Sequence, residues 1–362
     1  MVTLKDVCEK GSSNIKQSDL QAHDGEYPIY GASGFIKNVD FYQQDKPYIA
    51  VVKDGAGVGR VMKLPAYSSV IGTMQYIIPR DGVSVSYLSY VMDFMELAKY
   101  RTGATIPHIY FKDYCTEKLP AHSMQEQSKI AAILDKISAL IDFRKQQLEK
   151  LDGLVKARFV ELFGTYPANQ KGWQTGKIRD IVKDVRYGSS RPAVDGGAYP
   201  YLRMNNITYD GRLDLSNVKQ IDVPENELKN CTVQYGDVLF NRTNSKELVG
   251  KTCVYNRDEL MVLAGFVVRV RVNEKATPEF LSAFLNTDFS KHMLFEMCKA
   301  AIGQANINAQ EMQDIAIYIP PIELQKCFSA FVEEAEKMRL TIRQGLDKME
   351  TLKQALMQEY FT

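Results

Sequence analysis

The stretch TGATIPHI at residues 102–109 leads to KLP at residues 118–120 and then to Gln127, and the same order of features returns later in the sequence. There a second glycine-containing loop, IGQANIN, leads to YIP and to Gln325. In both places the loop precedes a short apolar strand, a proline, a glutamine and a long amphipathic helical pattern. Because this order is hard to obtain twice by chance, we interpret the chain as a tandem of two globular units, each followed by a helix.

The starts of the two halves also match. LKDV at residues 4–7 precedes a GSS turn at residues 11–13, and IRDI at residues 178–181 precedes a second GSS turn at residues 188–190. A unit that is duplicated from beginning to end indicates a binder with two heads.

Length and composition fit a protein whose two domains have separate cores. The chain has 362 residues, of which 45% are apolar and 25% are charged, and its net charge is +1. This balance argues against a strongly basic protein that coats DNA, but it is compatible with a sequence reader that has local basic loops.

The sequence carries no signal for a membrane span, a leader peptide or a metal site. It has no apolar run of about 18 residues and no signal-peptide pattern at residues 1–10. Its six cysteines form no C-x-x-C pair, so neither a zinc site nor a disulfide framework is predicted. We expect a cytoplasmic protein with reduced cysteines.

The periodicity of apolar residues predicts an α+β fold made of four segments. Residues 1–122 are expected to form a first mixed α/β domain, with strands at 48–52 and 75–78 and a helix at 84–100. Residues 123–165 are expected to form a long helix, because their apolar residues recur in steps of three and four.

The second half repeats this plan. Residues 166–320 are expected to form a second mixed α/β domain, with strands at 238–240 and 265–272 and a helix at 278–297. Residues 321–362 are expected to form a second long helix.

Each long helix carries a heptad-spaced apolar seam. We predict that the two helices pair with each other through these seams as an antiparallel coiled coil; the alternative is that each helix packs on its own domain. Arg144 and Arg339 fall on the seams, where a cation costs stability but fixes the register. The predicted seam residues are Ile130, Leu134, Ile137, Ile141, Leu148, Leu151, Val155, Val332, Ile342, Leu346, Met349 and Leu356.

The glycine-rich stretch KDGAGVGR at residues 53–60 is predicted to be a hairpin whose backbone can approach a partner closely. Its G-x-G-x-G spacing differs from the G-x-G-x-x-G of a dinucleotide loop, and the Lys-Ser or Lys-Thr of a P-loop is missing. We predict DNA contacts from Lys53 and Arg60, with a plain structural turn as the alternative.

Two polar segments of the second half offer side chains that read DNA. Arginine pairs with guanine and asparagine with adenine, and both also contact phosphates. The alternatives are a solvated loop and amides that satisfy the backbone of a turn. The predicted contacts are Arg203, Asn205 and Asn206 at a strand end, and Arg242, Asn244, Ser245, Lys246 and Lys251 in a polar loop.

The loops that open the duplicated stretches form a third matched pair. Their small and amide side chains suit contact with a DNA groove. A catalytic base at His108 is not favoured, because no nucleophile accompanies it and its counterpart is Asn308. The predicted contacts are Arg101, Thr105 and His108 in the first half, and Gln304, Asn306 and Asn308 in the second.

We find no catalytic and no metal-binding motif. The four histidines lie far apart without an H-x-x-x-H pair, and no G-x-S-x-G elbow is present. The prolines of IPPI at residues 319–322 lack the flanking polar and aromatic residues of an amino-methyltransferase motif. We therefore predict no catalytic residues in this chain.

Taken together, these motifs resemble the specificity subunit of type I restriction-modification systems. The resemblance covers nearly the whole chain, and although each motif is loose, their duplicated order is specific. The residues that carry it are LKDV at 4–7, YGASG at 30–34, GDVLFNRTNS at 236–245, the loops at 102–109 and 303–308, and the junctions at 119–134 and 320–325.

The resemblance implies two target-recognition domains, each reading half of a gapped DNA site, and two long helices that form an antiparallel spacer. It implies docking of two methyltransferase subunits that bind S-adenosylmethionine and methylate adenine, and of a motor-nuclease subunit that uses ATP. The chain itself would not be catalytic. The alternative is a coiled-coil interaction scaffold without DNA specificity.

Overall fold

The computed structural model of the chain describes residues 1–103, 105–298 and 305–362. These residues divide into two compact units. Unit 1 consists of Met1–Gln146 together with Ile342–Thr362, and unit 2 is Gln147–Thr341. No helix among the described residues is long and apolar enough to cross a bilayer.

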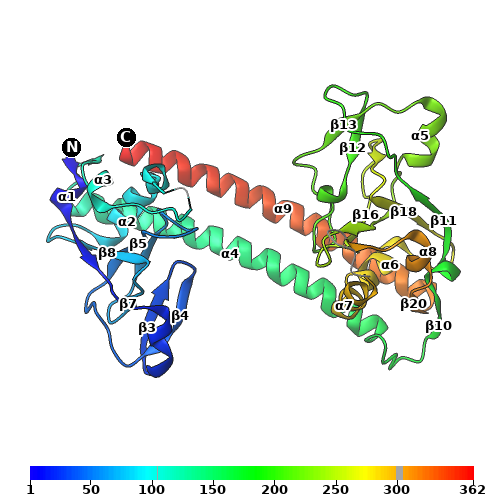
Figure 1. Cartoon of the computed structure of the whole chain (residues 1–362), viewed down its shortest axis with the longest axis horizontal. Helices are drawn as coiled ribbons and strands as arrows, with labels where there is room; N and C mark the ends of the chain where they lie inside the picture. Colours follow the sequence, from blue (N-terminus) through cyan, green and yellow to red (C-terminus); the bar gives the residue numbers. More distant parts are fainter. Residues whose placement is uncertain (104, 299–304) are drawn as a thin grey trace. The chain divides into compact units, whose positions relative to one another are not determined.

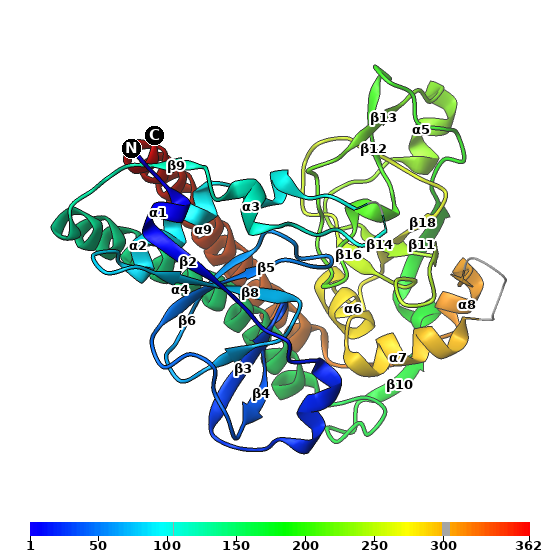
Figure 2. The same ribbon diagram turned by 60° about the vertical axis from the view of Figure 1, so that its left-hand side comes forward.

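Unit 1 is built on a four-stranded sheet, a three-stranded sheet and a two-stranded pair. In sheet order these are β2 (Cys8–Ser12), β8 (Met74–Pro79), β5 (Tyr48–Val52) and β6 (Val61–Leu64); β4 (Gly34–Val39), β3 (Tyr27–Gly31) and β7 (Ser69–Val70); and β1 (Val2–Thr3) with β9 (Lys118–Leu119). The large sheet is antiparallel throughout. In the smaller sheet β3 is antiparallel to β4 and parallel to β7, and Figure 2 shows the β3–β4 hairpin beside the large sheet.

The helix α2 (Val85–Phe94) packs its apolar face on the large sheet of unit 1. Leu88 and Met92 share a buried core with Ile49 and Ile77 of that sheet. The prediction of one helix over residues 84–100 is wrong about its end. Glu96 takes a left-handed conformation (φ 50°), and the chain continues as a 3₁₀ helix over Leu97–Tyr100. The shorter helices are α1 (Leu4–Val7), α3 (Phe111–Tyr114) and a 3₁₀ turn at Gln17–Ala22.

Unit 2 repeats the sheet plan of unit 1, which confirms the predicted duplication. Its sheets are β11 (Val182–Tyr187), β18 (Val267–Val272), β14 (Val238–Asn241) and β16 (Thr252–Val254); β13 (Lys219–Ile221), β12 (Tyr199–Leu202) and β17 (Val262–Leu263); and β10 (Gln174–Lys177) with β20 (Ala316–Ile319). The strand directions match too, because β12 is antiparallel to β13 and parallel to β17. One further pair joins β15 (Thr243–Asn244) to β19 (Ala305–Asn306).

The helices of unit 2 cover the large sheet and the loops around it. The predicted helix over residues 278–297 is in fact two helices, α6 (Pro278–Leu285) and α7 (Asp288–Met297). The chain turns between them because Thr287 caps α7, its hydroxyl accepting a hydrogen bond from Ser290 N–H. The remaining short helices are α5 (Glu225–Cys231) and α8 (Ala309–Gln313), with 3₁₀ turns at Ile178–Ile181 and Met204–Asn206.

The two long helices are α4 (Met124–Phe163) and α9 (Ile322–Phe361), and each contributes to both units (Figure 1). The chain leaves α4 at Gly164, whose φ of 80° is the left-handed conformation that commonly ends a helix. All of the predicted seam residues are buried or half-buried.

Contacts between α4 and α9 occur within each unit. In unit 1, Ile130 and Leu134 share a core with Met357 and Phe361, and Lys145 Nζ lies 3.1 Å from a Glu350 carboxylate oxygen. Moving forward along α4 therefore moves backward along α9, as in an antiparallel pair.

In unit 2 the same two helices meet through aromatic rings and an ion pair. Phe159 and Phe163 contact the ring of Phe328 edge-on, with ring centroids 5.5 Å apart in both cases. The seam cation Arg339 is buried and paired with Asp152. The carboxylate of Asp152 also pairs with Arg212, which lies in the loop after β12, so this ion pair joins both helices to the sheet domain.

Two buried glutamines occupy equivalent places at the starts of α4 and α9. Gln127 Oε1 accepts a hydrogen bond from Ser84 N–H (2.9 Å), and Gln325 Oε1 accepts one from Thr277 N–H (3.0 Å). Ser84 and Thr277 are the N-caps of α2 and α6. Each matched glutamine therefore ties a long helix to the first sheet-covering helix of its own unit.

Candidate nucleic-acid interface

Arg242 is the best-placed residue of unit 2 for base readout. It directly follows β14, and its backbone is held on two sides, because its N–H donates to Phe266 O (3.0 Å) and its carbonyl accepts from Ile307 N–H (2.9 Å). Its guanidinium lies over the ring of Tyr187, 4.9 Å from the centroid. Its Nε is buried and has no hydrogen-bond partner among the described residues.

Tyr187 fixes the plane in which the Arg242 guanidinium is presented. This tyrosine ends β11, is 45% exposed, and its hydroxyl accepts a hydrogen bond from Ala309 N–H (3.0 Å). An arginine stacked on an anchored ring loses less freedom when it binds, and its two-pronged donor edge matches the O6 and N7 acceptors of guanine.

Polar side chains of the β15–β19 pair surround this arginine. Asn306 is exposed, and its side-chain oxygen accepts a hydrogen bond from the Thr243 hydroxyl (2.9 Å). Asn244 is half-buried and donates to Asn241, while Ser245 is exposed. The structure thus brings together four of the predicted residues, Arg242, Asn244, Ser245 and Asn306.

Three other predicted contacts already have partners inside unit 2. Asn206 is 2% exposed, and its amide donates to the carbonyls of Asp214 and Asn217. Asn308 caps α8 by accepting from Gln310 N–H and Glu311 N–H (both 2.9 Å). In this structure both asparagines satisfy the backbone, which was the alternative interpretation of such amides. The third, Lys251, belongs to the pocket described below.

Two predicted contacts lie at the end of β12. Arg203 is half-buried, and its Nε has no hydrogen-bond partner among the described residues, while Asn205 is exposed. Both are separated in the sequence from the Arg242 loop, and within the described part of the chain their side chains form no hydrogen bond or ion pair with it. The remaining predicted residue of this half, Gln304, lies outside the described residues.

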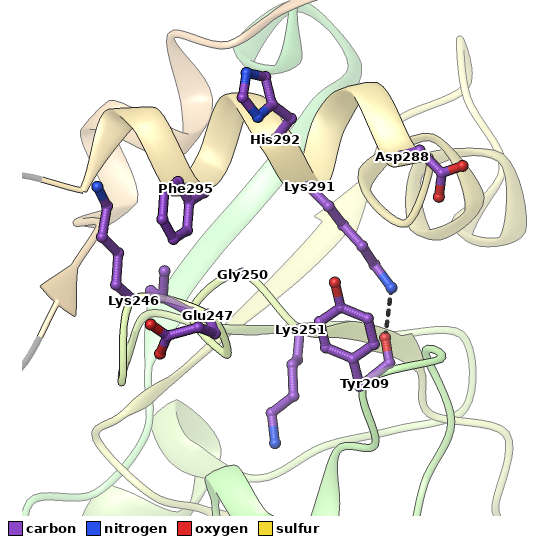
Figure 3. Close-up of a pocket in the computed structure, with 10 residues that line it drawn as sticks. Tyr209, Lys246, Glu247, Gly250, Lys251, Asp288, Lys291, His292 and Phe295 are labelled. Carbon is purple, nitrogen blue, oxygen red and sulfur yellow. Dashed lines mark hydrogen bonds between the residues drawn. The ribbon is translucent and has the colours of Figure 1, made fainter. Parts of the chain in front are cut away.

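An open pocket of about 370 Å³ lies between α7 and the loop after β15 (Figure 3). Lys246 and Lys291 stand on opposite walls, each against an aromatic ring: Lys246 Nζ is 3.9 Å from the centroid of Phe295, and Lys291 Nζ is 3.7 Å from that of Tyr209. Lys251 Nζ is turned to the Met204 carbonyl (2.8 Å). The loop favours glycine at residue 250, where φ is 82° and where a Cβ would lie 2.7 Å from the Leu294 side chain of α7.

Burial makes two of these lysines poor bases. It lowers the pKa of Lys291 to about 8, and the neighbouring Lys156 ammonium acts in the same direction while Asp288 opposes both. Burial also lowers the pKa of Lys251. A cation in such a place is stabilised by an anion that binds next to it.

Lys53 is the structural counterpart of Arg242 in unit 1. It directly follows β5 as Arg242 follows β14, and its carbonyl accepts a hydrogen bond from Ile109 N–H (2.9 Å), as that of Arg242 does from Ile307. The loop at residues 53–60 is a hairpin between antiparallel strands, as predicted, and the Pro107 carbonyl accepts from Gly55 N–H (2.9 Å). Two loops far apart in the sequence therefore form one surface.

The side chains on this surface of unit 1 are mostly exposed. Arg101 and Thr105 are exposed, and Arg60 is exposed with one guanidinium N–H donated to the Ala32 carbonyl (2.7 Å). His108 stacks edge-on against Tyr110, with ring centroids 5.0 Å apart. Lys53 lies 3.9 Å from the Asp54 carboxylate, a loose contact that leaves its ammonium accessible to a phosphate.

The aromatic residues of both surfaces were not predicted. Tyr187, Tyr209 and Phe295 come from three different elements, so no spacing in the sequence links them to the cations they contact. Tyr110 lies two residues after His108, and an exposed aromatic beside a polar loop was the one local signal available.

The chain matches a known family over most of its length. The family is described as the type I restriction modification DNA specificity domain, and the match covers residues 1–152 and 170–349. It is 23% identical over 286 residues to the specificity subunit of the type I restriction enzyme EcoKI of Escherichia coli, a match that covers 74% of this chain and 61% of that protein. It is 25% identical over 334 residues to the MjaVIII specificity subunit of Methanocaldococcus jannaschii, covering 85% of this chain and 77% of the relative.

The match to the StySPI specificity subunit of Salmonella potsdam covers 66% of that relative, so the chain spans less than two thirds of several relatives that it matches. Solved structures show the same fold. The S subunit of a type I restriction-modification system from M. genitalium aligns with a TM-score of 0.64 at 14% identity, over 99% of this chain and 95% of the other. A chain from a structure of type I complex assembly aligns with a TM-score of 0.54, also at 14% identity, over 99% and 96%.

Proposed function

Since the chain belongs to the family of type I restriction-modification DNA specificity proteins, we propose that it selects the DNA sequence on which a type I complex acts. It reads a gapped site in two parts, one with each unit. The observation that carries this proposal is a repeated arrangement. In each unit a cation directly follows the equivalent strand of the large sheet, Lys53 after β5 and Arg242 after β14, and its carbonyl accepts a hydrogen bond from the matched loop, at Ile109 and Ile307.

Two similar surfaces on one chain suit two separated stretches of duplex. Successive major-groove faces recur about every 34 Å along DNA, and a helix of 40 residues spans about 60 Å. We propose that α4 and α9 pair antiparallel along their length and act as the spacer that sets the gap. The contacts within each unit support this pairing.

The spacer helices also offer places for partner subunits. Large apolar side chains on α4 and α9 remain exposed, and four of them form two equivalent pairs 198 residues apart: Leu140 with Met338, and Leu154 with Leu352. Exposed apolar side chains that recur in this way favour protein contacts over solvent. We propose that two modification methyltransferase subunits dock there, with the two members of each equivalent pair contacting different subunits.

The chemistry belongs to those partners in this proposal. The methyltransferase subunits bind S-adenosylmethionine and methylate adenine, and a restriction subunit, where one joins, uses ATP. The chain contributes sequence choice and geometry and has no catalytic step of its own. A coiled-coil scaffold without DNA specificity is not favoured, because it leaves the matched polar surfaces without a role.

The proposal is tested by co-expressing the chain with its modification subunits and mapping adenine methylation over a whole plasmid by single-molecule sequencing. We expect a two-part motif with a fixed gap that disappears when the chain is omitted. A motif that persists without the chain, or methylation without sequence preference, contradicts the proposal. Modification subunits expressed alone are the matched control.

A further inference from the structure

We infer that the pocket between α7 and the loop at residues 246–251 binds a phosphodiester group of the DNA backbone beside the half-site that unit 2 reads. This inference rests on the proposed function and adds to it a site that holds DNA without reading its sequence. The pocket is formed entirely by unit 2.

Cations without carboxylate partners are the first observation that carries the inference. Among the described residues, Lys246, Lys251 and Lys291 form no ion pair with any carboxylate within 4.0 Å. By contrast, Arg269 and Arg271 on the large sheet of unit 2 are each paired with a carboxylate: Arg269 with Asp184, and Arg271 with Asp237. The pocket therefore sets three lysines against two carboxylates, Glu247 and Asp288, and a net positive charge remains.

The arrangement of Lys291 is the second observation. Its Nζ donates one hydrogen bond, to the Tyr209 carbonyl at 2.7 Å, and rests on the Tyr209 ring, as the dashed line in Figure 3 shows. An ammonium has three donors, so two remain for a ligand. Holding this half-buried cation beside Lys156 costs free energy that an incoming anion offsets.

The two carboxylates of the pocket leave its middle open. Glu247 and Asp288 lie at opposite ends in Figure 3, with Lys246 near the first and Lys291 near the second. His292 completes the rim on α7 and is exposed. Lys246 and Lys291 thus bring an ammonium group and an aromatic ring to each side of the pocket.

The kind of donor present favours phosphate binding over base readout. Lysine ammonium groups act as point charges that suit phosphate oxygens; lysine also contacts guanine, but arginine forks and amides match base edges with two bonds in a fixed geometry. Neither an arginine nor an amide side chain lines this pocket. The same chemistry would accept a free phosphate, so the test separates a backbone phosphate from a free one.

The test measures how DNA affinity of the complex reconstituted with modification subunits depends on salt, for wild type and for K246M and K291M. Methionine keeps much of the aliphatic stem and removes the charge. The slope of log K against log salt is negative, and each lost phosphate contact reduces its magnitude by about 0.9. We expect that decrease for both variants, on cognate and non-cognate duplexes alike, with the methylated motif unchanged.

Lys171 supplies the control, because it is an exposed lysine of unit 2 outside the pocket, and K171M should leave the slope unaltered. An unchanged slope in K246M and K291M overturns the inference while leaving sequence selection by wild type intact. So does an altered methylation motif, since it would place a base in the pocket. Wild-type complex that shows no preference for any duplex contradicts the proposed function instead.

The free-phosphate arm uses inorganic phosphate against chloride at equal ionic strength, with thermal unfolding of the same complex as the measurement. Stabilisation of wild type but not of K291M, combined with an unchanged DNA slope in K291M, would assign the pocket to a free anion and overturn the inference. A reduced magnitude of the salt slope in K291M, with or without stabilisation by phosphate, supports a contact with a backbone phosphate.

Discussion

Arg242 rests on the ring of Tyr187, and this contact distinguishes it from Arg269 and Arg271 of the same unit. Arg269 and Arg271 are tied to acidic partners on the large sheet, where they stabilise the fold. Arg242 instead lies on a ring, which accepts none of its N–H hydrogen bonds. Its guanidinium is therefore held in place while its N–H donors stay available to a ligand. This arrangement favours a specificity role over a structural one.

Replacing Arg242 by glutamine is expected to change one base of the half-site read by unit 2. Glutamine pairs with adenine where arginine pairs with guanine, and loss of a two-pronged contact changes discrimination by about 1–3 kcal/mol. Methylome sequencing of cells carrying the variant measures the motif directly. A shift in both half-sites, or in neither, would rule out this role.

Tyr187 allows a matched pair of variants on the same site. Y187F keeps the ring under the guanidinium, whereas Y187L removes it. We expect Y187F to preserve the motif and Y187L to relax the position that R242Q alters. Equal motifs in Y187F and Y187L would show that the ring does not position Arg242.

At the scale of elements, Asp152 on α4 is expected to contribute more to the stability of unit 2 than its partial exposure indicates. Its carboxylate pairs with Arg339 on α9 and with Arg212 in the loop after β12, and Arg339 is 5% exposed. Glu336 is a further neighbour of both cations. One carboxylate therefore joins both helices and the sheet domain of unit 2.

We expect D152N to destabilise the protein more than R339M. The asparagine leaves Arg339 buried with only Glu336, and an uncompensated charge costs about 3–5 kcal/mol when fully buried, and less here because Asp152 is one-third exposed. R339M leaves Asp152 paired with Arg212. Urea unfolding of the full chain gives both values, and an equal or reversed order would show that Asp152 is not the central partner.

The sequence predicted the elements that repeat locally and missed the points where chain geometry interrupts them. The seams and strands have regular apolar spacing, which survives in the structure. The breaks at Glu96 and Thr287 depend on a left-handed residue and a capping hydroxyl, and the apolar pattern runs through both without change. Periodicity reports which face is buried, and it does not report whether the backbone is continuous.

The candidate site was predictable to the extent that its residues are neighbours in the sequence. Arg242, Asn244 and Ser245 lie in one loop and were found together. Tyr187 and Tyr209 reach their cations only through the folded sheet, so no local pattern contained them. Asn206 and Asn308 show the converse. Their amide side chains are of the type that contacts bases, but in the structure these amides form hydrogen bonds with backbone groups of unit 2.

At the scale of the whole molecule, the proposed spacer makes the gap in the DNA site a matter of helix length. The test inserts seven helix-forming residues into each long helix where the chain passes between units, between Gln146 and Gln147 in α4 and between Thr341 and Ile342 in α9. Each helix becomes about 10 Å longer. We expect the gap to lengthen by about three base pairs with both half-sites unchanged.

Insertion into α4 alone is the control, because it breaks the pairing of the two seams and should abolish methylation. Single-molecule sequencing of methylated plasmid gives the gap in each case. A gap that stays constant after the double insertion would show that α4 and α9 do not set the distance.

Unit 1 draws its core from two parts of the chain that all of unit 2 separates. Met357 and Phe361 pack against Ile130 and Leu134, so residues 342–362 complete a core begun by residues 1–146. On the ribosome, the nascent unit 1 must wait, with part of its apolar surface uncovered, until the continuous unit 2 has been translated. The unit that is synthesised first is therefore the unit that completes its core last. Its exposed apolar surface is the part of the nascent chain that chaperones would bind.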